Sequence, residues 1–183
     1  MVLDNALALG SRVTAAFGQS YATSEEWASL LASRYGAENV SGGAAESIIT
    51  ASPYGDLSGT LPEGFQANHL NQNAVYRAII PQNEGLAVGV RGDAFAEPGT
   101  PHYNFHQSME QFWEQYRTGA LRGLRPTNSE YSQALVEALQ AGSYSPTQAA
   151  DLAAQAAAQR AAYGLPEAAP VPRIPGRINQ VEP

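Results

Sequence analysis

The chain lacks cysteine and lysine altogether, and it has only three histidines among 183 residues. Without cysteine, neither a disulfide nor a thiolate metal site can form. Any metal ligand must therefore be His, Asp, Glu, Asn or a backbone oxygen. Long apolar runs are absent too, and none approaches the roughly 20 residues that a membrane helix needs. We therefore expect no membrane span.

Positive charge is also scarce. Ten Arg stand against 17 acidic residues, so the net charge is −7. This balance counts against a broad nucleic-acid-binding face. The charges are unevenly spread, however, and residues 64–127 carry five Arg against five acidic residues. Phosphate affinity comes from local cations rather than from the average, so the middle third can still hold a phosphodiester.

The two ends of the chain show helical signals. Residues 23–36 open on a capping box and carry an apolar face at helical spacing, residues 8–18 form a weaker candidate helix, and residues 41–64 resemble a connector. Capping boxes at Thr127 and Ser145 predict two further helices, which end near Gly142 and Gly164. The short turn between them favours an antiparallel hairpin. The proline-rich residues 165–183 predict an extended tail that is mobile or lies on the surface.

The middle of the chain is broken by Gly and Pro into short elements. Residues 86–90 predict a strand that ends at a turn over residues 91–93. Pro101 favours a helix start, and aromatic residues at three- and four-residue spacing extend that helix to near Gly119. The aromatic stripe on this helix is expected to be core.

One stretch, FQANHLNQNAVY at residues 65–76, crowds amide side chains around His69. Buried amides need hydrogen-bond partners, so they fill a core poorly. A second feature is the spacing of His102 and His106, which places both imidazoles on one helix face where they can hold one ion. All three histidines fall within 38 residues. Taken singly, His69 is more often structural than catalytic, and an H-x-x-x-H pair is more often not a metal site.

The order His69, Asn83, His102, His106 resembles the HNH/endonuclease VII nucleases of the His-Me finger superfamily, and most closely the AHH-type toxin nucleases of bacterial polymorphic toxin systems. The family's Ala-His-His at the end of the first strand reads Ala67-Asn68-His69 here. The similarity covers roughly residues 60–118. It implies an α+β, mostly helical fold with a small ββα-metal finger core, followed by the helical hairpin and the tail.

The resemblance also implies roles for single residues. Position 68, His102 and His106 would hold one divalent ion (Mg, Mn, Zn or Ni), His69 would be the general base, and Asn83 would brace the loop. We add Asn71 and Asn73 as residues that position the imidazole or contact sugar-phosphate. Candidate phosphate contacts are Arg77 and Arg91, although exposed arginines are more often solvated charges.

Asn68 departs from the family, which has His at this position. An amide oxygen is a much poorer ligand for a transition metal than imidazole. The ion is bound weakly, or the chain is a natural variant, or the residue was changed to disarm a toxin. The third explanation is favoured, because an active nuclease kills its producer.

The function expected from the resemblance is phosphodiester hydrolysis, of DNA in preference to RNA, by a toxin module at the C-terminal end of a larger delivered polypeptide. A bacterial secretion system would carry it into the cytoplasm of a target cell, and an immunity protein would neutralise it. The domains would be residues 1–58, 59–126, 127–164 and 165–183. Two alternatives stay open: a non-enzymatic helical interaction module with structural histidines, and a metal-dependent hydrolase of another substrate.

Overall fold

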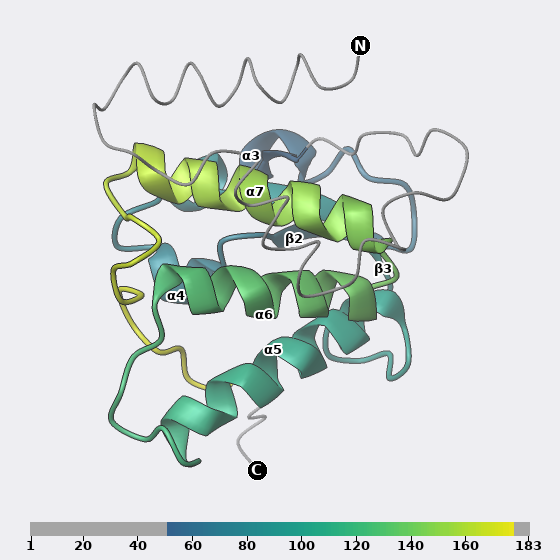
Figure 1. Cartoon of the computed structure of the whole chain (residues 1–183). Coiled ribbons are helices and arrows are strands. Elements are labelled where there is room, and N and C mark those ends of the chain that lie inside the picture. The colour runs from purple at the N-terminus through teal and green to yellow at the C-terminus, as the bar shows by residue number, and fades with distance from the viewer. Residues whose placement is uncertain (1–50, 178–183) are drawn as a thin grey trace. The chain divides into compact units, whose positions relative to one another are not determined.

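The structure, a computed structural model, describes residues 51–177 (Figure 1). The helices expected at residues 8–18 and 23–36 lie outside these residues. The described part has a mixed α+β architecture that is mostly helical, with a small three-stranded antiparallel sheet followed by three helices. The coarse fold class expected from the sequence is thus confirmed.

The sheet is built from β1 (Ser52–Pro53), β2 (Phe65–His69) and β3 (Leu86–Arg91), in the order β1-β3-β2. In the register of β2 and β3, Phe65 lies opposite Arg91 and His69 lies opposite Ala87. Three short helical turns connect the strands: α3 (Tyr54–Leu57), α4 (Asn73–Tyr76) and the 3-10 turn η2 (Gln82–Glu84). The strand predicted at residues 86–90 is confirmed as β3, whereas β1 and α3 occupy the stretch taken for a connector.

The first long helix is α5 (Pro101–Arg117), which begins and ends where the sequence predicts. Thr100 caps it by accepting a hydrogen bond from the backbone N–H of Tyr103, and Pro101 stands at the first helical position, where its missing N–H costs nothing. Of its aromatic stripe, Phe105, Trp113 and Tyr116 are buried as expected, whereas Phe112 is only half-buried.

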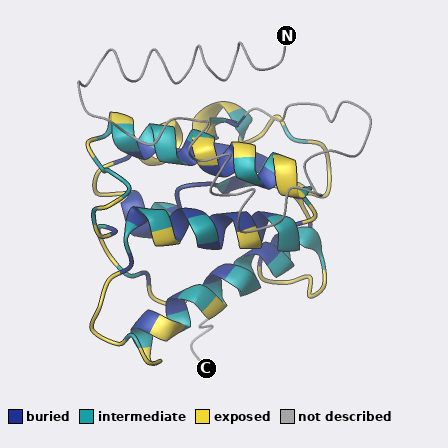
Figure 2. Cartoon of the chain, viewed as in Figure 1, coloured by how far each residue is buried: buried dark blue, intermediate teal, exposed yellow. Residues whose placement is uncertain are grey.

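The two remaining helices are α6 (Asn128–Ala141) and α7 (Pro146–Ala162), and both expected capping boxes are present. The amide of Asn128, at the start of α6, donates to the carbonyl oxygen of Pro166, beyond the end of α7. The two helices therefore run antiparallel, as predicted. Figure 2 shows that α6 is largely buried, which fits its place between α5 and α7.

The described part of the segment after α7, residues 163–177, contains turns and is packed onto the helices. Val171 is completely buried, and its backbone N–H donates to the carbonyl oxygen of Pro126. Thr127 and Pro170 form an isolated antiparallel bridge. Between residues 51 and 177, no helix is long and apolar enough to cross a membrane.

Candidate functional site

The first turns of α5 bring His102 and His106 together. Their Nε2 atoms lie 3.2 Å apart, and the ring centroids are 4.9 Å apart. This is the i, i+4 contact that the sequence predicts on one face of a helix. His102 is buried and His106 is half-buried.

The carbonyl oxygen of Gly92 sets the tautomer of His102. It lies 3.3 Å from Nδ1, and because a carbonyl only accepts, Nδ1 carries the proton. In the neutral ring, Nε2 then has a lone pair directed toward His106. A backbone carbonyl that holds the remote ring nitrogen is the usual support of a metal-binding histidine.

Burial keeps both rings neutral. It lowers the pKa of His106 to about 4, with a further contribution from His102. Burial also lowers the pKa of His102, although the bond to Gly92 and the charge of Asp93 partly offset this effect. Neutral imidazole is the form that binds metals. Moreover, Nδ1 of His106 is buried without a hydrogen-bond partner among the described residues.

His69 lies at the end of β2, in a setting built by three other residues. Its Nε2 donates to the carbonyl oxygen of Gln82 at 2.9 Å, which leaves the lone pair on Nδ1. The ring stacks on Tyr54 with centroids 4.2 Å apart and an interplanar angle of 13°. Gly85 makes room for it, since a Cβ there would lie 2.8 Å from the imidazole Cδ2.

The pKa of His69 is lowered by burial, with a smaller opposing effect from the hydrogen bond to Gln82. The ring is therefore neutral near pH 7. A neutral imidazole with one nitrogen held by a carbonyl and a lone pair on the other has the form that a general base requires.

Asn68 points away from its neighbour His69, because side chains alternate between the faces of a strand. It pairs with Val88 and is only 4% exposed. Among the described residues, its amide forms no hydrogen bond to either helix histidine, and its Nδ2 is buried without a partner. An unpaired buried amide nitrogen is costly in a native core.

His69 and the His102–His106 pair lie at opposite ends of β3. His69 is opposite Ala87, with its ring against Gly85, whereas His102 contacts Gly92. Ala87 and Gly92 are about 16 Å apart at the usual rise of a strand. Within residues 51–177, no group of three or more His, Cys, Asp or Glu side chains is placed to hold a metal ion. The structure thus brings together two of the three imidazoles.

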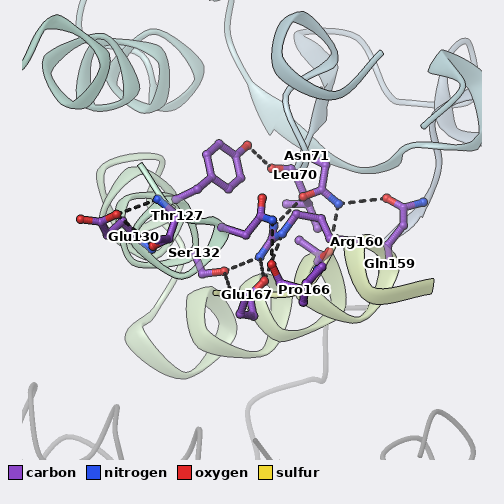
Figure 3. A network of polar contacts seen from close by, with 12 residues as sticks. Leu70, Asn71, Thr127, Glu130, Ser132, Gln159, Arg160, Pro166 and Glu167 are labelled. Carbon is purple, nitrogen blue, oxygen red and sulfur yellow. Dashed lines mark hydrogen bonds and ion pairs between the residues drawn. The ribbon is translucent and has the colours of Figure 1, made fainter. Parts of the chain in front are cut away.

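The amide cluster has a structural role that the sequence analysis did not assign. Asn71 is 2% exposed, and its Oδ1 accepts a 2.6 Å hydrogen bond from Arg160 while its Nδ2 donates to Ala156 and Gln159 of α7 (Figure 3). Gln72 accepts from the indole N–H of Trp113 at 2.7 Å. These amides join the end of β2 to the helices, so Asn71 is not free to contact a sugar-phosphate.

The other candidate residues lie near the surface. Asn83 is exposed in η2, beside the carbonyl that holds His69, and its Cβ packs over Gly55. Arg77 and Arg91 are exposed, the first directly after α4 and the second at the end of β3. Asn73 is half-buried at the start of α4, with an unpaired buried Oδ1.

Sequence reasoning missed the residue that organises this region. Arg160 is completely buried and donates to Asn71, Ser132 and Glu167, with a 2.7 Å ion pair to the last (Figure 3). Its guanidinium also lies 5.4 Å from the ring centroid of Tyr131. The available signal was one Arg inside an otherwise Ala-rich helix, with Glu167 seven residues later.

Comparison with known proteins identifies no relative: no protein-family model, no curated protein and no solved structure matches the chain.

Proposed function

We propose that this protein is a metal-dependent nuclease of the ββα type, in which β2, β3 and α5 form the finger. One observation carries the proposal. The Nε2 atoms of His102 and His106 face each other at 3.2 Å, and the Gly92 carbonyl leaves the His102 lone pair on that nitrogen. Two neutral imidazoles that converge through ring nitrogens suit one divalent ion.

The residues present fit such an ion in a second respect. Nδ1 of His106 is buried without a partner in the described part of the chain, so the ring can change tautomer without breaking a hydrogen bond there. If Nε2 of His106 binds an ion, its proton moves to Nδ1, as in other histidine ligands. When bound, the ion would supply Lewis-acid stabilisation of the charge that develops on the phosphate. Asn68 is the candidate third ligand, through its amide oxygen.

His69 is the proposed general base. Its Nε2–H is held by Gln82, so Nδ1 is the nitrogen that would take a proton from the attacking water. Tyr54 and Gly85 fix the ring plane. In an in-line displacement, the nucleophile and the leaving group lie on opposite sides of phosphorus. His69 lies about 16 Å along β3 from the histidine pair, farther than a single phosphate spans, so the His69→Ala variant described below decides whether it serves the phosphate at that pair.

Nucleic acid is the proposed substrate, and DNA is favoured over RNA. Few cations surround the site, with Arg91 at the end of β3 and Arg77 beyond α4. Binding should therefore be weak and independent of sequence. The same proposal includes a cognate immunity protein, a larger delivery polypeptide and action in the cytoplasm of a target bacterium.

The test is plasmid cleavage by four chains: the unsubstituted chain, Asn68→His, and Asn68→His combined with either His69→Ala or His106→Ala. Supercoiled DNA is incubated with Mg²⁺, Mn²⁺, Zn²⁺ or Ni²⁺, and calorimetry measures metal affinity in parallel. We expect Asn68→His to bind metal more tightly and to nick DNA. Loss of the base should lower the rate by ~10²–10⁴. Loss of His106 should abolish metal binding as well.

The His69→Ala and His106→Ala variants distinguish the general base from the metal ligand. His69→Ala should leave metal affinity unchanged, whereas His106→Ala should not. Folding of each chain is checked by circular dichroism. Metal binding without cleavage of any DNA or RNA would favour a hydrolase of another substrate that uses the same ligands.

The second candidate function is a non-enzymatic helical interaction module. The observation that favours it is the burial of Asn71 and Gln72, whose amides bond to Arg160 and Trp113 within the protein. In that case the three histidines are packing residues. The prediction is then that no chain in the series binds a divalent ion.

A further inference from the structure

The loop between β3 and α5 holds an aromatic side chain out toward solvent beside the histidine pair. Phe95 is 56% exposed, and its ring centroid lies 5.8 Å from that of His106. A single exposed apolar side chain is not unusual in itself, but this ring lies beside the candidate site, where a bound ligand could cover it.

The loop is held rigidly by hydrogen bonds. Oδ1 of Asp93 accepts from the backbone N–H groups of Phe95 and Ala96 at 2.7 and 2.8 Å, and Oδ2 accepts from Gln66 of β2 at 2.8 Å. These bonds lower the pKa of Asp93, so its carboxylate stays ionised. The backbone at Phe95 is thus held before any ligand arrives, which reduces the entropy lost on binding.

The charge around Phe95 limits what can bind there. Asp93 precedes it by two residues, and Glu97 follows by two and accepts the backbone N–H of Asp93. Two carboxylates would repel a phosphate, so the part of a nucleic acid that lies against the ring would be an uncharged part rather than the backbone. A nucleobase meets this requirement, and every base has a π-face that can stack on an aromatic side chain.

We infer that Phe95 stacks on an unpaired nucleobase adjacent to the phosphate at the His102–His106 pair. This inference rests on the proposed nuclease function and adds a substrate preference to it. Bases inside a duplex already stack on each other, so a single strand, a frayed end or a bulge offers a free face at lower cost. The enzyme should accordingly prefer single-stranded over duplex nucleic acid.

The experiment measures binding of short oligonucleotides that carry the fluorescent base 2-aminopurine, with a divalent ion present at a concentration that fills the proposed site, in the Asn68 chain, which is not expected to cleave. Single-stranded DNA, single-stranded RNA and duplex DNA are compared for the unsubstituted chain, Phe95→Leu and Phe95→Trp. Leu keeps an apolar side chain beside His106 but removes the π-face, whereas Trp retains it. Leu124→Ala is the control, because Leu124 is equally exposed and lies between α5 and α6.

We expect Phe95→Leu to raise the Kd for single strands about tenfold and to remove 2-aminopurine quenching, as for loss of one stacked base. Phe95→Trp and Leu124→Ala should bind like the unsubstituted chain, and duplex binding should change little. Equal effects on single-stranded DNA and RNA would mean that the base alone is recognised, and unequal effects would add a sugar contact.

Two outcomes overturn the inference in distinguishable ways. If the unsubstituted chain binds and Asn68→His cleaves nucleic acid, but Phe95→Leu binds single strands as tightly as before, stacking is excluded and the nuclease proposal stands. If no chain binds or cleaves any oligonucleotide, the stacking inference and the nuclease proposal are both wrong.

Discussion

Single residues in this protein take their roles from the backbone groups that surround them. His69 and His102 each direct one ring nitrogen to a backbone carbonyl, of Gln82 and Gly92 respectively. The sequence indicated which histidines to consider, but it could not indicate these carbonyls, because any residue can supply one. The role of Asn71 was missed because its partner Arg160 lies 89 residues away in the sequence.

Gly85→Ala tests whether the His69 ring packs as closely against Gly85 as the geometry indicates. The added methyl would lie 2.8 Å from the imidazole Cδ2, so the ring must leave its place over Gly85 and lose the bond to Gln82. We expect the free energy of unfolding to fall by about 1–3 kcal/mol, as for other overpacked sites. The NMR signal of the His69 ring should also shift.

The matched control is Gly176→Ala, since a methyl there meets no atom within 4 Å. An unchanged His69 signal in Gly85→Ala would contradict the proposed close contact. If the nuclease proposal is correct, cleavage by the Asn68→His background should fall with Gly85→Ala as it does with His69→Ala.

Low pH should weaken the metal-free protein through its histidines. The pKa of His106 is about 4 in the folded chain, against 6.5 when unperturbed, so the unfolded chain binds more protons between these values. Stability from the neutral ring is thus complete above pH 6.5 and is lost as the pH falls toward 4. Burial of His69 and His102 acts in the same direction.

Urea unfolding at several pH values, with a chelator present, measures this loss. For His106 alone, the slope should approach about 1.4 kcal/mol per pH unit within the window. His106→Gln should flatten the curve. A slope that is identical in the two chains would show that His106 titrates normally in the folded state.

At the scale of elements, the long helices were predictable and the short elements were not. The starts of α5, α6 and α7 have local causes: a capping Thr or Ser, a proline at the first position, or a Glu or Gln three residues on. The two-residue strand β1 and the single turn α3 have no such periodicity. They form because β3 and the loop around them offer partners, as in the bond from Tyr54 N–H to Gly85.

Thr127→Ala measures what one helix start contributes. Thr127 Oγ1 accepts from the backbone N–H of Glu130, whose carboxylate accepts from Thr127 N–H at 2.7 Å. Loss of the hydroxyl should lower the free energy of unfolding by about 1 kcal/mol. Thr127→Ser keeps the acceptor and should be close to neutral. Equal losses in the two variants would assign the effect to the methyl group instead.

At the scale of the whole molecule, one buried cation joins four segments. Arg160 of α7 bonds to Asn71 after β2, to Ser132 of α6 and to Glu167 of the C-terminal segment. A buried ion pair of this kind is a weak source of stability in itself. Removal of the arginine is costly, however, because Asn71 and Ser132 are buried, Glu167 is half-buried, and all three lose their donor.

Arg160→Met should therefore destabilise the protein by about 3–5 kcal/mol in chemical unfolding. Arg160→Met with Glu167→Gln should recover part of the loss, since no uncompensated carboxylate remains. The exposed Arg173 provides the control, and Arg173→Met should be nearly neutral. A loss in Arg160→Met no larger than in the control would show that the network adds little to folding.

Residues 165–177 are part of the folded unit, although their prolines are typical of a free tail. Val171 is completely buried, its N–H bonds to Pro126, and Pro170 pairs with Thr127 at the start of α6. A carboxylate at position 171 has no partner there, and a buried unpaired charge is among the costliest changes in a core. Val171→Asp should therefore detach the segment, expose it to proteases and lower the unfolding midpoint. Arg173→Asp, at an exposed position two residues on, should have none of these effects.

Because Glu167 lies in the same segment, detachment should also weaken its ion pair with Arg160. The losses of stability from Val171→Asp and Arg160→Met should therefore be less than additive. Full additivity in the double variant would mean that the segment and the cation contribute independently.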